Sequence, residues 1–323
     1  MDKRRLLIGG LVCATGIGAV YWLAPEVHPF GLNSRMIEWR VNRILGAPLT
    51  LLKNTVLMPE FWAVIALTLT LERLLPAKPN QSWFGVTFMQ DLVWFVYETI
   101  LHTIIIVTYA QLLITIYHRN FEFLTIHAAK EWPSWVQFAV AVLLLDLMYW
   151  MQHYVNHKVP LLWSFHSVHH SQRELNFFTD FRYHVVEYVV RHTFLVIPFL
   201  VLAVEAPTII LFAIFQRWYT RVYHGNIRTN LGPLRYVLVT PQSHRVHHSI
   251  EGRHSDTNFG SLFSVWDHLF GTQYRRYDEY PDTGIEDAAF PMERSTRIRD
   301  LLVTPIVQMA YPFQRILRKD TSA

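Results

Sequence analysis

The sequence predicts an all-α protein, a polytopic membrane helix bundle of about four to six transmembrane helices with a histidine-rich cap on the cytoplasmic side. Three observations support this fold class. The 323 residues are 51% hydrophobic and only 17% charged, whereas typical soluble domains have about 25% charged residues. Several apolar stretches approach the roughly 20 residues that cross a bilayer as a helix. The 17 histidines gather beside the later apolar stretches.

Six stretches are candidate spans. They cover residues 6–24, 55–75, 92–117, 134–151, 185–204 and 207–223. Residues 6–24 follow a basic start and are either a true span or a cleaved signal peptide. Lys3, Arg4 and Arg5 place the N-terminus in the cytoplasm, because cytoplasmic segments carry the excess of basic residues. Alternation of the spans then places the chain after residue 153 on the cytoplasmic face.

Two further segments have the pattern of helices that lie at the membrane interface. Residues 35–45 and 297–318 combine apolar residues with arginines at helical spacing, as amphipathic helices at a lipid surface do. We therefore expect both to lie along the membrane rather than across it.

Eleven of the 17 histidines lie between residues 153 and 248, and eight of them form three blocks. The blocks are H-x3-H at 153–157 and H-x2-H-H at 166–170 and again at 244–248. A spacing of four puts two imidazoles on one face of a helix. A lone histidine in an apolar helix is more often a satisfied core group, but this many rings without metal would leave buried polar groups unpaired.

The blocks therefore predict metal binding. Eight block histidines, with His224 and His184 between them, are too many for one ion and suit two ions held close together. Imidazole favours iron, copper, zinc and nickel over magnesium and calcium. The sparse carboxylates nearby are better placed to hydrogen-bond the far nitrogen of a ligand ring, and Asp146, Glu187 and Asn258 are the candidates for this supporting role.

This pattern resembles the fatty acid hydroxylase/sterol desaturase superfamily of integral membrane di-iron oxygenases. The resemblance covers roughly residues 90–275 and rests on the blocks with their flanking text, HSVHHS at 166–171, RYHVVE at 182–187, TPQSHRVHHS at 240–249 and TNFG at 257–260. It implies no catalytic residue beyond the metal ligands, which would be His153, His157, His166, His169, His170, His244, His247 and His248, with His224 and, less securely, His184.

The resemblance implies that two iron ions activate O2 to hydroxylate, or desaturate, an unactivated C–H bond of a lipid such as a fatty acyl chain or sterol. Zinc can substitute for iron in purified samples. The sequence has no G-x-G-x-x-G, C-x-x-C or cytochrome-b5-like haem motif, so we expect an external electron donor, either a ferredoxin or cytochrome b5 with its reductase. The alternatives are a membrane metal-binding transporter and a zinc-dependent membrane hydrolase.

We expect three regions: N-terminal membrane and interfacial helices in residues 1–90, a fatty acid hydroxylase-like catalytic domain in residues 91–275 and an interfacial tail in residues 276–323. The net charge of +4 is too mild to indicate a nucleic-acid partner. The single cysteine, Cys13, excludes an internal disulfide framework. We expect a multi-pass integral membrane protein with a cytoplasmic catalytic face, in a bacterial inner membrane rather than the endoplasmic reticulum.

Overall fold

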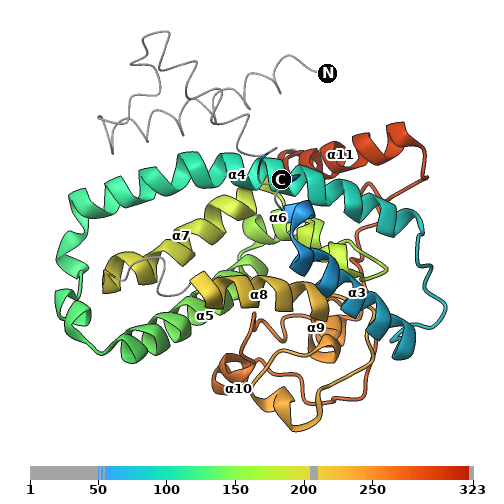
Figure 1. The fold of residues 1–323 in the computed structure, drawn as a ribbon. Helices are drawn as coiled ribbons and strands as arrows, with labels where there is room; N and C mark the ends of the chain where they lie inside the picture. Colours follow the sequence, from blue (N-terminus) through green and yellow to red (C-terminus); the bar gives the residue numbers. More distant parts are fainter. Residues whose placement is uncertain (1–49, 51, 54, 204–209, 320–323) are drawn as a thin grey trace, which may run out of the picture.

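The computed structural model describes residues 50, 52–53, 55–203 and 210–319, and this part of the chain is helical (Figure 1). The α-helices are α3 (Pro59–Leu74), α4 (Val86–Asn120), α5 (Ser134–Lys158), α6 (Pro160–His170), α7 (Val185–Leu202), α8 (Ile210–Tyr223), α9 (Pro241–His247), α10 (Val265–Phe270) and α11 (Ile298–Lys319). Short 3-10 helices are η1 (Glu122–Leu124), η2 (His127–Glu131), η3 (Phe177–Phe181), η5 (Gly232–Tyr236) and η6 (Gly252–His254). Within the described residues, β pairing is limited to isolated bridges, which confirms the all-α prediction there.

Two of the described helices, α5 and α7, are long and apolar enough to cross a membrane. They pack against each other, and α7 also packs against α4, so that the three long helices lie alongside one another in Figure 1. The predicted spans 55–75, 92–117 and 207–223 fall on α3, α4 and α8. The predicted span 6–24 and the interfacial segment 35–45 lie outside the described residues. A total of four to six spans therefore stays a prediction.

Short helices with strong start signals form a cap at one end of the long helices (Figure 1). Helix α6 follows α5 after the single residue Val159 and starts with Pro160, whose fixed φ and missing N–H suit the first helical position. Helix α9 starts with Pro241 after a capping box in which Thr240 and Ser243 satisfy each other's backbone N–H groups. These two starts place the second and third histidine blocks.

A buried charge network ties the cap to α4. The Arg182 guanidinium lies 2.6 Å from both Asp91 of α4 and Glu293, and the second Asp91 oxygen accepts from the side chains of Asn176 and Thr179. Burial lowers the pKa of Arg182, but the two carboxylates outweigh it and raise the pKa above its usual value. The network holds the segment between α6 and α7 in place, because losing one partner would leave a buried charge uncompensated.

Candidate metal centre

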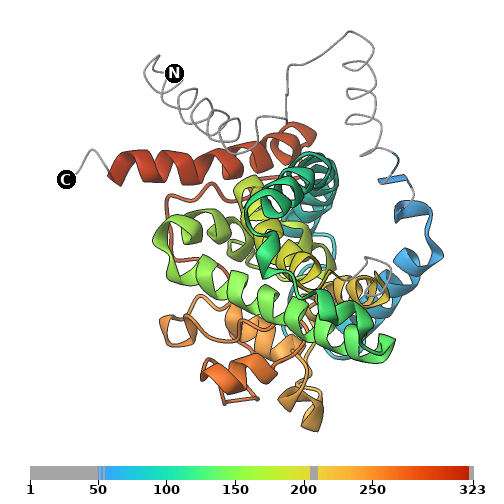
Figure 2. The same ribbon diagram turned by 90° about the vertical axis from the view of Figure 1, so that its left-hand side faces the viewer.

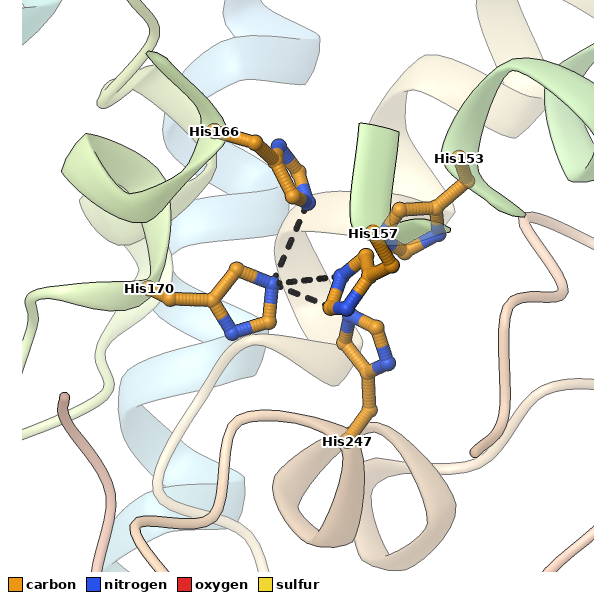
Figure 3. A group of neighbouring side chains, drawn as sticks. All are labelled: His153, His157, His166, His170 and His247. Atoms are coloured by element: carbon orange, nitrogen blue, oxygen red, sulfur yellow. Dashed lines mark hydrogen bonds between the residues drawn. The ribbon is translucent and has the colours of Figure 1, made fainter. Parts of the chain in front are cut away.

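Nine of the ten predicted ligand histidines converge at the junction of α5, α6, α8 and α9. They form two groups in which one ring nitrogen of each member lies within 4.8 Å of one from every other member. Group A, which is drawn in Figure 3, is His153, His157, His166, His170 and His247, and group B is His169, His224, His244 and His248. The groups adjoin, since the His170 and His248 rings stack with centroids 4.3 Å apart.

Each H-x2-H-H block is shared between the two groups. In the block at 166–170, His166 and His170 belong to group A and His169 to group B, whereas in the block at 244–248 the outer pair belongs to group B and His247 to group A. Residues four apart lie on one helical face, and the residue between them points to a neighbouring direction. Each of these two blocks therefore supplies two histidines to one group and one histidine to the other.

Oxygen acceptors fix one nitrogen in each of five rings. In four of them Nδ1 faces a backbone carbonyl: His153 faces Phe259 at 3.0 Å, His169 faces Arg182 at 3.2 Å, His224 faces Thr220 at 2.6 Å and His247 faces Thr257 at 2.8 Å. The Nδ1 of His166 faces the Glu187 carboxylate at 2.7 Å. A carbonyl or carboxylate oxygen accepts but does not donate, so these five Nδ1 atoms carry the proton.

In a neutral ring the proton on Nδ1 leaves Nε2 with a bare lone pair, and these lone pairs face one another. The Nε2 atoms of His169 and His224 are 3.3 Å apart although both Nδ1 atoms donate to carbonyls, so neither Nε2 has a hydrogen to offer. In group A, the His170 Nε2 lies 3.1 Å from those of His166 and His247 and 3.2 Å from that of His157 (Figure 3). One N–H cannot satisfy three such contacts.

A metal ion bound between these nitrogens would remove the repulsion between their lone pairs. Imidazole nitrogens bind a first-row metal ion at about 2 Å, so nitrogens that share one ion lie about 3 Å apart. The Nε2 of His153 is buried without a hydrogen-bond partner, although it belongs to group A. In addition, the hydrogen bonds from Nδ1 to oxygen acceptors are the ones that metal-bound histidines ordinarily make through the ring nitrogen that does not bind the metal. The residues therefore fit two ions with nearly all-nitrogen ligand sets.

Protonation of the rings does not remove this repulsion, because the rings stay neutral near pH 7. Burial lowers the pKa of His169, His244 and His248 well below the usual 6.5, and neighbouring imidazoles lower it further. Burial likewise lowers the pKa of His247, to about 3. These rings are neutral near pH 7 and available as ligands.

Of the three residues predicted to support the ligands, only Glu187 contacts a histidine, through its bond to His166. Asp146 instead accepts from the backbone N–H groups of Leu262 and Phe263 at 3.0 and 3.1 Å. Asn258 donates to the Ser243 carbonyl and accepts from the Tyr274 N–H, both at 2.8 Å. These two residues act on the histidines only by shaping the loop whose carbonyls, at residues 257 and 259, hold group A.

His184 lies in neither group, contrary to its place in the predicted ligand set. Its Nδ1 accepts from the Val186 N–H at 3.0 Å, which caps α7, and its Nε2 donates to the Met309 carbonyl at 2.8 Å. Both ring nitrogens are thus used, and no lone pair is left for a metal ion. The ring instead joins the start of α7 to α11.

Asp180, one of the sparse carboxylates near the blocks, lies beside group B together with Tyr183. Asp180 lies 3.6 Å from the His224 Nδ1 and accepts from the Thr220 and Tyr183 hydroxyls at 3.0 and 3.3 Å. The Tyr183 ring stacks on His169 with an interplanar angle of 8°. The sequence marked Asp180 as a carboxylate near the blocks, whereas it gave no sign of the role of Tyr183 or of the backbone acceptors.

A cleft of about 620 Å³ leads to group A. Its lining includes His157, His170 and His247 with Trp163, and also Tyr311 and Arg315 of α11. Its volume falls in the range of about 300–1,000 Å³ that is usual for small-molecule sites. A separate cavity of about 40 Å³ touches both groups, and its lining includes Tyr183 and Asp180.

The fold and the site define a class of protein, a helical one with two apolar helices able to cross a membrane and a buried pair of histidine groups suited to metal ions. Comparison with known proteins shows which family the chain resembles. Residues 138–272 match the fatty acid hydroxylase family model. With the relatives described next, this match supports the resemblance to the fatty acid hydroxylase/sterol desaturase superfamily.

The relatives act on lipids according to their names. The chain is 34% identical over 158 residues to alkylglycerol monooxygenase of Danio rerio, which covers 47% of this chain and 33% of that protein. It is 28% identical over 142 residues to ornithine lipid hydroxylase OlsE of Rhizobium tropici, which covers 44% and 43% of the two chains. The match thus spans less than half of each relative. No solved structure matches the chain significantly.

Proposed function

We propose that the protein is a membrane di-iron oxygenase that hydroxylates an unactivated C–H bond of a lipid, with one iron ion held by group A and one by group B. The observation that carries this proposal is the set of Nε2 lone pairs that face one another about 3 Å apart. An all-imidazole set accepts several first-row metals. The choice of iron and of O2 rests on the superfamily and on relatives named as monooxygenase and hydroxylase.

The residues of the chain divide the work of such a reaction. The five Nδ1–H donors and their oxygen acceptors orient the ligand rings, since such second hydrogen bonds fix the tautomer and direction of a ligand. The bound irons would supply the reductive activation of O2 that an unactivated C–H bond requires. Burial of His169, His170, His244 and His248 keeps bulk water from the reacting groups and suppresses side reactions.

The cleft beside group A is the proposed place for the reacting part of the lipid. Trp163 packs against the His157 and His170 rings, with centroids 4.9 and 5.2 Å apart, and offers an apolar surface next to the ligands. Hydroxylation uses one O2, two electrons and two protons, and yields the alcohol and water. We propose an external ferredoxin, or cytochrome b5 with its reductase, as the electron source.

The relatives named above favour hydroxylation over desaturation and over the transporter and zinc-hydrolase alternatives. The test is to supply the purified, iron-loaded full chain with a reduced ferredoxin, a lipid extract and isotopically labelled O2, and to analyse the lipids by mass spectrometry. The proposal predicts a lipid that gains one labelled oxygen atom, in wild type but not in a His169→Ala variant. A loss of two hydrogens would establish desaturation, and no change with full iron loading would overturn the oxygenase assignment.

A further inference from the structure

Helix α11 turns large apolar side chains outward, unlike a helix on a water-soluble surface. Its outward side carries Ile298, Ile306 and Phe313, which are 76%, 52% and 46% exposed. Gln308 on its inner side is fully buried. Surface helices of soluble proteins turn the apolar stripe toward the core and the polar residues toward water. The outward face of α11 therefore suits a hydrocarbon environment.

The inner face of α11 is fixed by polar contacts to the start of α4. Gln308 accepts from the Trp94 indole at 3.0 Å, and the carbonyls of Leu301 and Leu302 accept from Gln90 and Tyr97. These bonds satisfy the buried amides and leave the apolar side chains outside. The helix is thus anchored through polar groups on its inner side while apolar side chains on its outer side stay exposed.

The direction of α11 differs from that of α4 and α7. In Figure 2, α4 and α7 are seen nearly end-on while α11 is seen along its length, so α11 crosses α4. The contacts of α11 with Gln90 and Trp94 lie at the start of α4. At the same end of the molecule, the Met309 carbonyl of α11 accepts a hydrogen bond from His184 at the start of α7. If α7 crosses a membrane, α11 lies along the membrane surface on the side of the histidine groups.

Positive charge marks the beginning of α11. Arg294, Arg297 and Arg299 are exposed and follow one another closely before and within its first turn. Arginine stems lie along apolar surface while their guanidinium groups reach the headgroups, and anionic headgroups attract basic residues near the surface. Apolar residues flanked by arginines are the pattern of helices that bind at the lipid interface.

We propose that α11 lies in the plane of an anionic lipid surface, with Ile298, Leu302, Ile306 and Phe313 inserted among the acyl chains. Tyr311 and Arg315 on the inner side of the same helix line the cleft that leads to group A. Insertion of α11 therefore places the cleft wall at the lipid surface. A lipid can then reach the cleft from the adjoining leaflet, a consequence that rests on the proposed function, whereas the insertion itself does not.

The test measures where the outer face lies, independently of activity. Cys13, the only cysteine, is replaced by serine, and single cysteines at Leu302 or Ile306 carry a nitroxide label in the full chain, reconstituted into phosphatidylcholine vesicles with phosphatidylglycerol. Leu234→Cys is the matched control, because Leu234 is an equally exposed aliphatic residue (56%) in the cap. Electron paramagnetic resonance then measures how strongly two paramagnetic reagents speed the spin relaxation of the label: O2, which enters lipid, and a water-soluble nickel complex.

Insertion predicts that labels at positions 302 and 306 are several-fold more accessible to O2 than to nickel, and that the label at 234 shows the reverse. A nickel-accessible label at 302 and 306 would place the helix in water and overturn the proposal. Inaccessibility to both reagents would overturn it as well, since residues 1–49 or a second copy would then cover the face. Arg297→Gln with Arg299→Gln should reduce the O2 preference in these vesicles, and an unchanged preference would refute the role of anionic headgroups.

Discussion

Replacing Glu187 by glutamine tests the support of the ligand rings at a single atom. The Glu187 Oε1 accepts from the His166 Nδ1 at 2.7 Å, and both side chains are 3% exposed. Glutamine keeps the shape and an acceptor oxygen but removes the negative charge that makes the imidazole a better metal ligand. Loss of such a partner ordinarily costs about 10- to 100-fold in metal affinity, which corresponds to about 1.4–2.7 kcal/mol.

The assay is competition for Fe(II) between the purified protein and a chelator under anaerobic conditions. The control is Glu122→Gln, because Glu122 is paired with His118 on an exposed surface where both side chains are 56% exposed. The weaker of the two binding steps should lose about 10- to 100-fold in Glu187→Gln and nothing in the control. If Glu187→Gln binds both ions as tightly as wild type, His166 is not held as a metal ligand by this carboxylate, and the reasoning fails.

Three further variants address other parts of the structure. His169→Ala should abolish product formation and remove one of two bound ions without preventing membrane insertion, whereas His118→Ala should leave product and metal content unchanged. Gly260→Ala should destabilise the loop beside group A by about 1–3 kcal/mol, measured by thermal unfolding. The reason is that a Cβ at this position would lie 2.8 Å from a carbonyl oxygen and 2.8 Å from a valine methyl. Gly252→Ala is the neutral control, because open space surrounds that position. Burial raises the pKa of Glu293, but the charge of the Arg182 guanidinium and the hydrogen bonds to the carboxylate together outweigh it and hold the pKa below the usual 4.5. This carboxylate therefore stabilises the fold above that pH, and the stabilisation is lost as the pH falls through the lowered pKa. Glu293→Gln should therefore unfold more easily than wild type at pH 7, by about 1.5–3 kcal/mol, and equally easily once the pH is well below 4.5; a difference that persists in acid would contradict this origin.

The histidine blocks could be found in the sequence because their spacing is local. A spacing of four placed His153 with His157 and His166 with His170, and each pair does fall in one group. The assignment of His169 and His247 to opposite groups could not be predicted in this way, because it depends on how α6 packs near α9. Their carbonyl partners are backbone atoms, which every residue has, so the sequence does not mark them.

The membrane helices show the same division between local and tertiary information. Hydropathy located α5 and α7, which are apolar along most of their length. It also suggested the stretches on α3 and α8, whose described helices have 16 and 14 residues and are shorter than the roughly 20 residues that cross a bilayer as a helix, so their place in the membrane stays a prediction. His184 resembled a ligand by its position between two blocks, yet the start of α7 requires a cap, and the ring serves that purpose.

The most direct test of the central claim is an anomalous difference map, measured at the iron absorption edge, from crystals of the full chain loaded with Fe(II). The account predicts two peaks, one bounded by His153, His157, His166, His170 and His247 and the other by His169, His224, His244 and His248. A single peak at full iron occupancy, or iron bound away from these nine rings, would contradict it.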